Sequence, residues 1–240
     1  SDGVQRYAGL FRAADTKETL IKKARLASIL GTIQATFTKF PYLRKVWQRN
    51  TEEERLLGVS LTGIYDNRLT CTPGSELEQL LTDMREAARE TNHQYSELLD
   101  IPSSAAITCV KPSGTVSQLV DSASGIHPRH ARYYIRRVRG DKKDPLTQFL
   151  IEQGVPVEDD VYKPNQTAVF SFPQKAPDGL VRDDVSPIDH LELWLTYQRF
   201  YTEHKPSITV SVDENEWPSV GAWVWEHFEE LSGVSFLPKD

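Results

Sequence analysis

Two long stretches of the chain place apolar residues at the three- and four-residue steps of an amphipathic helix. The first covers 17–39. Asp15 or Thr16, which precede it, can cap its N-terminus. The second and stronger one begins at Ser75 and ends before Pro102. The positions of the two stripes are Leu20, Ile21, Ala24, Ala27, Leu30, Ile33 and Phe37, then Leu77, Leu80, Leu81, Met84, Ala87, Ala88, Thr91, Tyr95 and Leu98. The pattern predicts two helices that each bury one face.

Shorter elements lie between and after these helices. A helical stretch over 42–55 and a strand over 56–61 separate the two. Strands then alternate with helices: strands over 106–110, 133–139, 167–172, 207–212 and 234–237, and helices from 115 and over 144–153, 188–204 and 217–231. Such alternation predicts an α/β fold with a largely parallel sheet, either open or closed into a barrel. A length of 240 residues favours one large domain over two small ones.

Composition narrows the class of protein. Hydrophobic residues at 39% and charged residues at 26% are typical of a globular protein. No apolar run approaches the roughly 20 residues that a membrane span needs, so no membrane partner is expected. A net charge of -6 argues against a general nucleic-acid binder. The first residues lack the layout of a secretion signal and two cysteines make no disulfide scaffold, so we expect a cytoplasmic setting.

One region is rich in basic residues, although the net charge of the chain is negative. Between His127 and Lys143 the only acid is Asp141. The basic residues of this run are Arg129, Arg132, Arg136, Arg137, Arg139, Lys142 and Lys143. The run fits either a site for an anionic small molecule or a solvated basic strand edge.

The segment 111–117 is the best candidate for ligand binding. It connects a predicted strand to a predicted helix, the place where α/β sheets bind ligands. Its residues are Lys111, Pro112, Ser113, Gly114, Thr115, Val116 and Ser117. Glycine permits close approach of the backbone, proline fixes the turn, and the N–H groups and hydroxyls that follow are anion donors. We call this segment the cradle and expect it to bind phosphate. It lacks the P-loop pattern, and the alternative is a well-capped helix after a tight turn.

A second loop, 121–128, follows the short helix and is expected to fold over the same crevice. Its candidate residues are Ser124, Gly125 and His127. His127 and His130 are three residues apart, but Pro128 prevents a regular helical turn between them, so no metal site is expected. We call 121–128 the crevice loop.

Neither cysteine is expected to be a nucleophile. Cys109 lies at a strand end before the cradle, where a small core residue is the more common occupant. Cys71 sits in a turn without a nearby histidine, and no catalytic serine motif is present. The chain therefore yields no candidate catalytic residue.

Several segments together resemble a known family. Residues 108–120 read Thr-Cys-Val-Lys-Pro-Ser-Gly-Thr-Val-Ser-Gln-Leu-Val, and 124–130 read Ser-Gly-Ile-His-Pro-Arg-His before Tyr134-Ile135-Arg136. Supporting segments are 53–64, 169–173, 203–207 and 232–238. The chain from about residue 15 to 238 resembles the catalytic chain of adenosylcobalamin-dependent (class II) ribonucleotide reductase.

The resemblance implies a fold and a role for the cradle. The family fold is a ten-stranded α/β barrel of two five-stranded halves, and this chain corresponds to its C-terminal part. Residues 15–240 would form the partial barrel domain, while 1–14 depart from the family. In the family, the loop equivalent to Pro112, Ser113, Gly114, Thr115 and Val116 holds the phosphates of a ribonucleoside di- or triphosphate substrate.

The resemblance also implies what this chain lacks. The family reduces ribonucleotides to 2'-deoxyribonucleotides by thiyl-radical chemistry that adenosylcobalamin initiates, and it needs at least three cysteines. The two here lie outside an Asn-Pro-Cys finger-loop context. We therefore expect a fragment or split-gene half, inactive alone, whose partner is the N-terminal half of the enzyme on another chain and which shares the cofactor contacts. The alternative is an inactive nucleotide-binding or partner-binding fragment.

Overall fold

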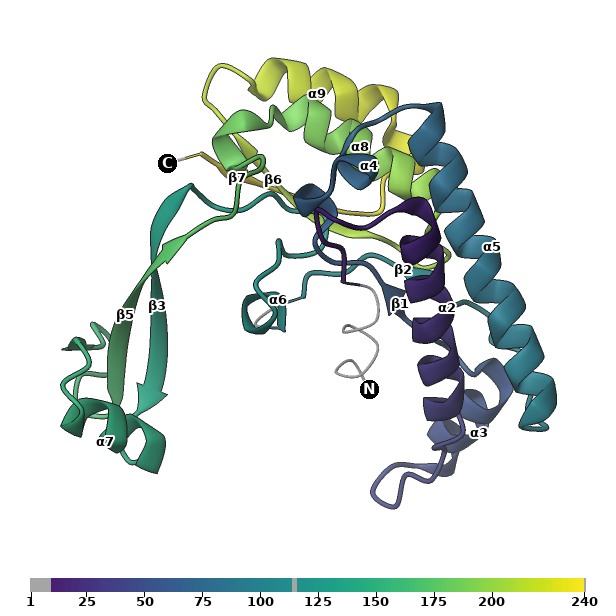
Figure 1. Ribbon diagram of the computed structural model, residues 1–240, viewed down its shortest axis with the longest axis horizontal. Coiled ribbons are helices and arrows are strands. Elements are labelled where there is room, and N and C mark those ends of the chain that lie inside the picture. Colours follow the sequence, from purple (N-terminus) through teal and green to yellow (C-terminus); the bar gives the residue numbers. More distant parts are fainter. Residues whose placement is uncertain (1–9, 114–115, 240) are drawn as a thin grey trace. The chain divides into compact units, whose positions relative to one another are not determined.

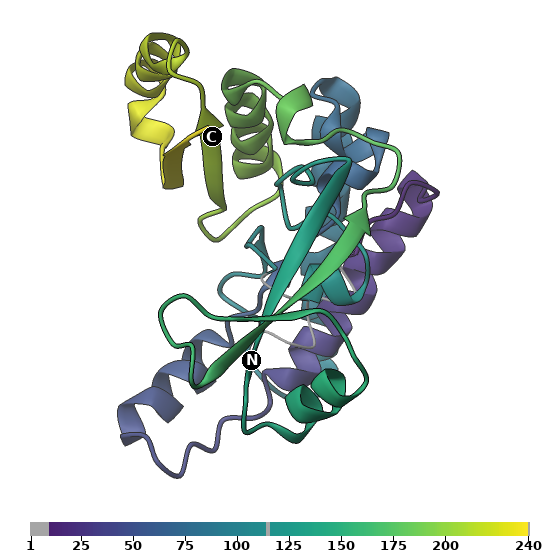
Figure 2. The ribbon, with the colours of Figure 1, turned by 90° about the vertical axis from the view of Figure 1, so that its left-hand side faces the viewer.

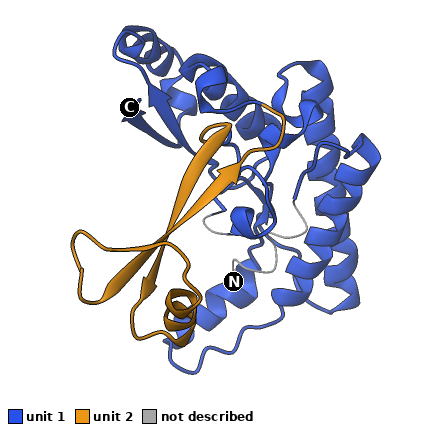
Figure 3. Cartoon of the chain, turned by 60° about the vertical axis from the view of Figure 1, so that its left-hand side comes forward, with its two compact units in different colours: residues 1–129, 180–240 blue, residues 130–179 orange. Residues whose placement is uncertain are grey.

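The chain forms two compact units (Figure 3). Unit 1 comprises Ser1–Arg129 and Leu180–Asp240, and unit 2 is His130–Gly179. The computed structural model describes residues 10–113 and 116–239. Unit 2 is thus inserted into the chain of unit 1. The assignment of 15–240 to one barrel domain stays a prediction.

The strands of unit 1 pair in parallel (Figure 1). They are β1 (Val59–Ser60), β2 (Thr108–Cys109), β6 (Ser207–Val212) and β7 (Gly233–Pro238). β1 pairs with β2, and β6 pairs with β7. A helix lies between the partners of each pair in the sequence, as parallel connections require. The predicted α/β class and parallel pairing are therefore confirmed in unit 1.

One further contact joins these pairs, and another adds a segment beside β1. The backbone N–H of Ser207, at the start of β6, donates to the carbonyl of Val110 at 3.0 Å. Leu10 forms a parallel bridge with Thr62, which lies just beyond β1. The described segments therefore follow the order Leu10, β1, β2, β6, β7. A closed barrel stays a prediction.

The helices of unit 1 cover this layer of strands. They are α2 (Lys17–Gln34), α3 (Lys45–Glu54), α4 (Arg68–Cys71), α5 (Ser75–Leu98), α6 (Val116–Leu119), α8 (Pro187–Phe200) and α9 (Trp217–Glu226), with 3-10 turns η1 (Ile64–Asp66), η2 (Arg182–Asp184) and η3 (Phe228–Glu230). α2 packs along α5, and α8 packs against α5, α9 and β6. The hydroxyl of Ser28 on α2 donates to the carbonyl of Ala88 on α5 at 2.7 Å. No helix among the described residues has the length and apolar character that a membrane crossing requires.

The first helix is shorter than its pattern predicts. It ends at Gln34, whereas the apolar stripe continues to Phe37. The hydroxyl of Thr36 donates to the carbonyl of Ile33, and that of Thr38 donates to Glu52 at 2.9 Å. The segment after Gln34 is thus held by Thr38 against α3 and does not continue the helix.

The core of unit 1 lies between the strand layer and α8. Its largest fully buried side chains include Trp194, Tyr197 and Tyr201. The phenol of Tyr197 donates to the carbonyl of Thr70 at 2.8 Å, and that of Tyr201 donates to Val59 in β1 at 2.9 Å. Buried hydroxyls with partners stabilise the core and fix α8 against β1.

Unit 2 departs from the predicted parallel sheet. Its elements are β3 (Tyr133–Asp141), α7 (Pro145–Glu152), β4 (Val157–Asp159) and β5 (Thr167–Lys175). The strands form an antiparallel sheet in the order β3-β5-β4, and β3 and β5 run side by side over nine residues (Figure 2). The prediction of parallel strands here was wrong because the chain returns antiparallel, so α7 is not a crossover helix.

Three basic residues of the run pair with acids of β4 and the residue after it. The ion pairs are Arg137–Glu158 at 2.6 Å, Arg139–Asp160 at 2.9 Å and Lys142–Asp159 at 2.6 Å. Each pair includes at least one exposed partner, so these are surface pairs of small energetic effect. The pairs favour the interpretation of the run as a solvated strand edge.

Candidate phosphate-binding site

The cradle lies at the end of β2, where an α/β sheet binds ligands. Lys111, Pro112, Ser113, Val116 and Ser117 are described, and Gly114 and Thr115 lie outside the described residues. The helix α6 that follows has only four residues. The N–H of Val116 donates to the carbonyl of Ser113 at 3.2 Å. The expectation that this N–H is available to an anion was therefore wrong, because it donates within the turn itself.

Lys111 is fixed at both ends. Its backbone N–H donates to the hydroxyl of Ser60 at 3.1 Å. Its ammonium donates to the carbonyl of Lys205 at 2.6 Å, so the side chain extends toward the segment before β6. Lys111 thus joins the cradle to β1 and to that segment.

Ser113 connects the cradle to the crevice loop. Its side chain is buried, and its hydroxyl lies 2.9 Å from the hydroxyl of Ser124. The backbone N–H of Ser113 also donates to the Ser124 hydroxyl at 3.3 Å. The structure therefore brings these two residues together, 11 positions apart in sequence.

Gly125 lies directly against the start of the cradle. Its φ is +57°, and a Cβ atom at this position would lie 2.9 Å from the carbonyl oxygen of Lys111. Its N–H donates to the hydroxyl of Thr62 at 2.9 Å. Close approach and a left-handed backbone together require glycine here. The crevice loop is thus packed onto residues 111–113.

His127 closes the crevice loop with both ring nitrogens. Nδ1 donates to the carbonyl of Ser124 at 3.0 Å, and Nε2 accepts the backbone N–H of Thr209 at 2.9 Å. This arrangement requires the neutral ring with its proton on Nδ1. Burial lowers the pKa of His127 below its ordinary value, which favours the same neutral form.

His190 supports the loop from the core. Its Nε2 donates to the carbonyl of Ile126 at 2.9 Å, and its ring meets those of Tyr65 and His127 edge to face. Burial lowers the pKa of His190 to about 4. Sequence reasoning missed this residue, because it lies on α8, 64 positions beyond its partner.

A buried arginine was also missed. Arg129 belongs to the basic run in sequence, but its side chain is only 8% exposed and lies between Asp66 and Asp121. No local pattern indicates this, because Asp66 precedes Arg129 by 63 positions. Arg129 is thus an internal contact of the crevice loop.

The cysteines fit the core interpretation. Cys109 is buried in β2, directly before Val110 and the cradle. Cys71 is half-buried at the end of α4, and burial raises its thiol pKa. A raised pKa disfavours the nucleophilic thiolate.

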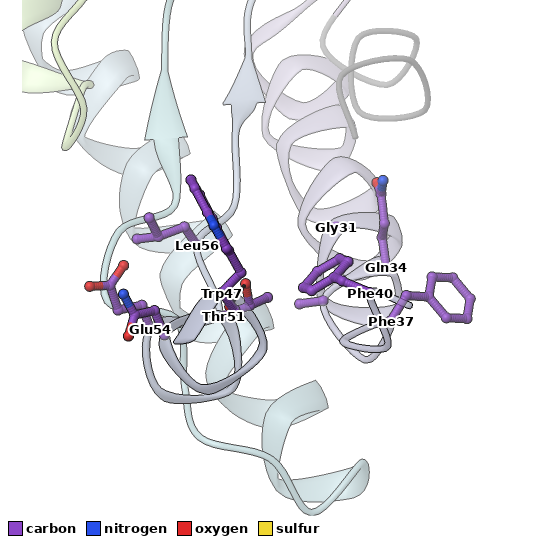
Figure 4. Close-up of a pocket in the computed structure, with 10 residues that line it drawn as sticks. Gly31, Gln34, Phe37, Phe40, Trp47, Thr51, Glu54 and Leu56 are labelled. Carbon is purple, nitrogen blue, oxygen red and sulfur yellow. Dashed lines mark hydrogen bonds between the residues drawn. The ribbon is translucent and has the colours of Figure 1, made fainter. Parts of the chain in front are cut away.

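A separate pocket of about 630 Å³ lies between the end of α2 and α3. Phe40 and Trp47 lie on opposite walls of it, and Glu54 contributes the carboxylate among its lining residues (Figure 4). Aromatic walls beside a carboxylate are unsuited to phosphate. The cradle remains the candidate for an anion.

The cradle and the crevice loop together bring small residues and hydroxyl groups to the end of a parallel strand. The contacts of Ser113 with Ser124 and of Gly125 with Lys111 hold the two loops together.

The chain is similar to several named ribonucleotide reductases. No family model matches it. An adenosylcobalamin-dependent ribonucleoside-triphosphate reductase of Euglena gracilis is 31% identical over 198 residues, which are 80% of this chain and 27% of that protein. A probable reductase of the same description from Dictyostelium discoideum is 31% identical over 232 residues, 93% of this chain and 29% of that protein. The chain thus spans less than a third of these relatives.

A solved structure shares the fold. The crystal structure of a B-12 dependent (class II) ribonucleotide reductase matches with a TM-score of 0.76 at 22% sequence identity. The match covers 97% of this chain and 36% of the other. The fold predicted from the sequence resemblance is therefore confirmed for a part of that protein's length.

Proposed function

Because this chain is a homologue of adenosylcobalamin-dependent ribonucleotide reductases over most of its length, we propose that it forms part of such an enzyme. In this proposal the cradle, 111–117, holds the substrate phosphates. The crevice loop contributes Ser124, Gly125 and His127 to the same site. The role of the chain is to bind and orient the ribonucleotide.

The contact between Ser113 and Ser124 carries this proposal. Two loops of small residues meet there at the end of a parallel strand, with hydroxyls 2.9 Å apart. Because the hydroxyl groups of both loops are held by the fold, a phosphate would meet groups that are already positioned. The geometry supports the role that the sequence resemblance implies.

The proposed substrate is a ribonucleoside triphosphate. The Euglena and Dictyostelium relatives are both named for triphosphates. Hydroxyl and backbone donors respond to charge more than to phosphate number, so the cradle alone would accept a diphosphate as well. Discrimination between the two belongs in this proposal to contacts beyond the cradle.

The described residues offer no separate site for a bare metal ion. They contain no cluster of three or more His, Cys, Asp or Glu side chains suited to a metal. His127 uses both ring nitrogens, and His190 and His204 bond to backbone carbonyls. We assign no cofactor contact to these residues.

The radical chemistry is likewise proposed to lie outside this sequence. Of its two cysteines, Cys109 is buried and Cys71 has a raised pKa. We propose that the remaining barrel strands and the radical cysteine come from a further polypeptide stretch, on the same or another chain. The setting proposed for this enzyme is the cytoplasm.

Calorimetric titration of the purified chain tests the binding role. The probes are CTP, inorganic triphosphate and cytidine, and binding of the first two but not of cytidine is expected. S124A should weaken binding, whereas S219A, an exposed serine on α9, should not. Absence of triphosphate binding by the unchanged chain would overturn the proposal.

A second experiment separates a working part from an inactive binding fragment. The chain is mixed with a polypeptide that carries the other barrel half, adenosylcobalamin and a dithiol, and CTP reduction is assayed. Restored turnover is expected. Nucleotide binding without turnover in the mixture would favour the inactive fragment.

A further inference from the structure

Arg129 is a buried cation held between two carboxylates. Its Nε lies 3.2 Å from Oδ1 of Asp66, and its Nη2 lies 3.3 Å from Oδ2 of the same carboxylate. Nη1 donates to Oδ1 of Asp121 at 2.9 Å, and Nη2 donates to the backbone carbonyl of Asp121 at 2.9 Å. The planar fork of arginine thus serves two partners at once, which an ammonium group cannot do in this geometry.

Asp66 transmits this contact to the crevice loop. Its Oδ2 accepts the backbone N–H of Ala123 at 2.7 Å, so one carboxylate joins the guanidinium to the loop backbone. Asp121 has a left-handed backbone, with φ +48°, and its side chain is exposed except for the contact with Arg129. Arg129 therefore fixes the loop at residue 121 directly and at residue 123 through Asp66.

Thr62 provides a third attachment. Its hydroxyl donates to the carbonyl of Ala123 at 3.0 Å and accepts the N–H of Gly125 at 2.9 Å. Residues 121, 123 and 125 are thus tied to the body of unit 1. Ser124, between two of them, directs its hydroxyl to Ser113 of the cradle.

We propose that Arg129 is a positioning residue for the phosphate site, holding the crevice loop so that Ser124 stays against Ser113. This inference rests on the proposed function of the cradle. Arg129 does not touch the ligand in this arrangement. It acts through Asp66 and Asp121, and its positive charge is neutralised by these two carboxylates.

The principal test compares R129K with the unchanged chain, using inorganic triphosphate as the probe. Lysine keeps the charge but loses the fork, so affinity should fall on the order of tenfold, which corresponds to the free energy of about one hydrogen bond. Amide hydrogen exchange at Ala123 and Gly125 should accelerate in the variant. R199K is the matched control, because Arg199 forms a two-point pair with Glu230 on the surface. Its affinity and its exchange at Ala123 should not change.

A milder variant covers the case in which R129K does not fold. D121N removes one charged partner of Arg129, and asparagine tolerates the left-handed backbone of this position. Its affinity should fall by a smaller factor than in R129K, again with faster exchange at Ala123.

The outcomes are distinguishable. If the unchanged chain does not bind triphosphate, the proposed function fails and this inference fails with it. If the unchanged chain binds, but R129K or D121N binds equally well despite faster exchange at Ala123, the inference alone is wrong. An equal loss in R199K would also contradict it, because the effect would then be one of general stability.

Discussion

The Nε2 atom of His127 accepts the backbone N–H of Thr209 at 2.9 Å, which joins the crevice loop to β6. Because Nδ1 of the same ring donates to Ser124, one neutral imidazole connects the loop backbone to the strand layer. Ser124 also meets Ser113, so this contact chain leads from β6 to the cradle. The position of the loop therefore depends on a ring that carries no charge.

H127L is expected to destabilise unit 1. Leucine fills similar space but leaves the N–H of Thr209 and the carbonyl of Ser124 without these partners. A buried group that loses its hydrogen bond costs about 1–3 kcal/mol. Urea unfolding measures the loss, and H93L, which alters an exposed histidine on α5, is the control. Equal stability of H127L and the unchanged chain would contradict the inferred contact.

The low pKa of His190 leads us to expect that the free energy of unfolding depends on pH. Its pKa is about 4 in the folded chain and 6.5 ordinarily, so the unfolded chain binds more protons between these values. The free energy of unfolding should therefore fall as pH drops from 6.5 toward 4, by up to about 3 kcal/mol. Below that pH this group adds no further loss.

H190Q isolates this effect. Glutamine retains an N–H donor for Ile126 but does not titrate. The difference in unfolding free energy between the unchanged chain and H190Q should shrink as pH falls from 6.5 to 4. A difference that stays constant over this range would show that His190 has the same pKa in the folded and the unfolded chain.

G125A should weaken the site. The added Cβ would lie 2.9 Å from the Lys111 carbonyl oxygen, and φ is left-handed. We expect a loss of about 1–3 kcal/mol in unfolding free energy, together with weaker triphosphate binding. G221A is the control, because a Cβ there meets no neighbour within 4 Å and the helix α9 favours alanine. Thermal melting of both variants measures the loss of stability, and calorimetric titration with triphosphate measures the loss of binding.

E203Q tests the contact between Glu203 and the start of β2. The carboxylate of Glu203 accepts the N–H groups of Ile107 at 2.9 Å and Thr108 at 3.2 Å. Charge-assisted bonds are stronger than neutral ones, so the neutral amide should lower the unfolding free energy by about 1–2 kcal/mol. E229Q, an exposed change in η3, should leave denaturant unfolding unaltered. The same loss in both variants would mean that net charge rather than these bonds is responsible.

The elements of unit 1 could be predicted because their apolar periodicity is strong. The stripe from Leu77 to Leu98 matches α5, and the small apolar run before the cradle contains β2. Alternation of strands and helices was misleading in unit 2. The sequence of β3 does not indicate which strand it pairs with, or whether that pairing is parallel or antiparallel. Burial alternates along β3 as in an exposed ribbon, but burial is known only after folding.

The loops of the site could be located from composition, but their supports could not. Ser113 and Gly125 stand out as small residues in turn-forming segments. Asp66, Thr62 and His190 are ordinary residues in their own surroundings, and each reaches the crevice loop across more than 50 positions. Contacts of that separation depend on the tertiary fold, which periodicity does not encode.

Unit 2 begins and ends at neighbouring points of unit 1. Arg129 and Val181 form a parallel bridge, and the N–H of Arg182 donates to the carbonyl of Arg129 at 2.8 Å. The chain between them can therefore lengthen, shorten or change its sequence without altering the spacing of the two residues that flank it. This makes unit 2 an exchangeable module, in which evolution can vary one part of the chain while the residue that anchors the crevice loop stays in place.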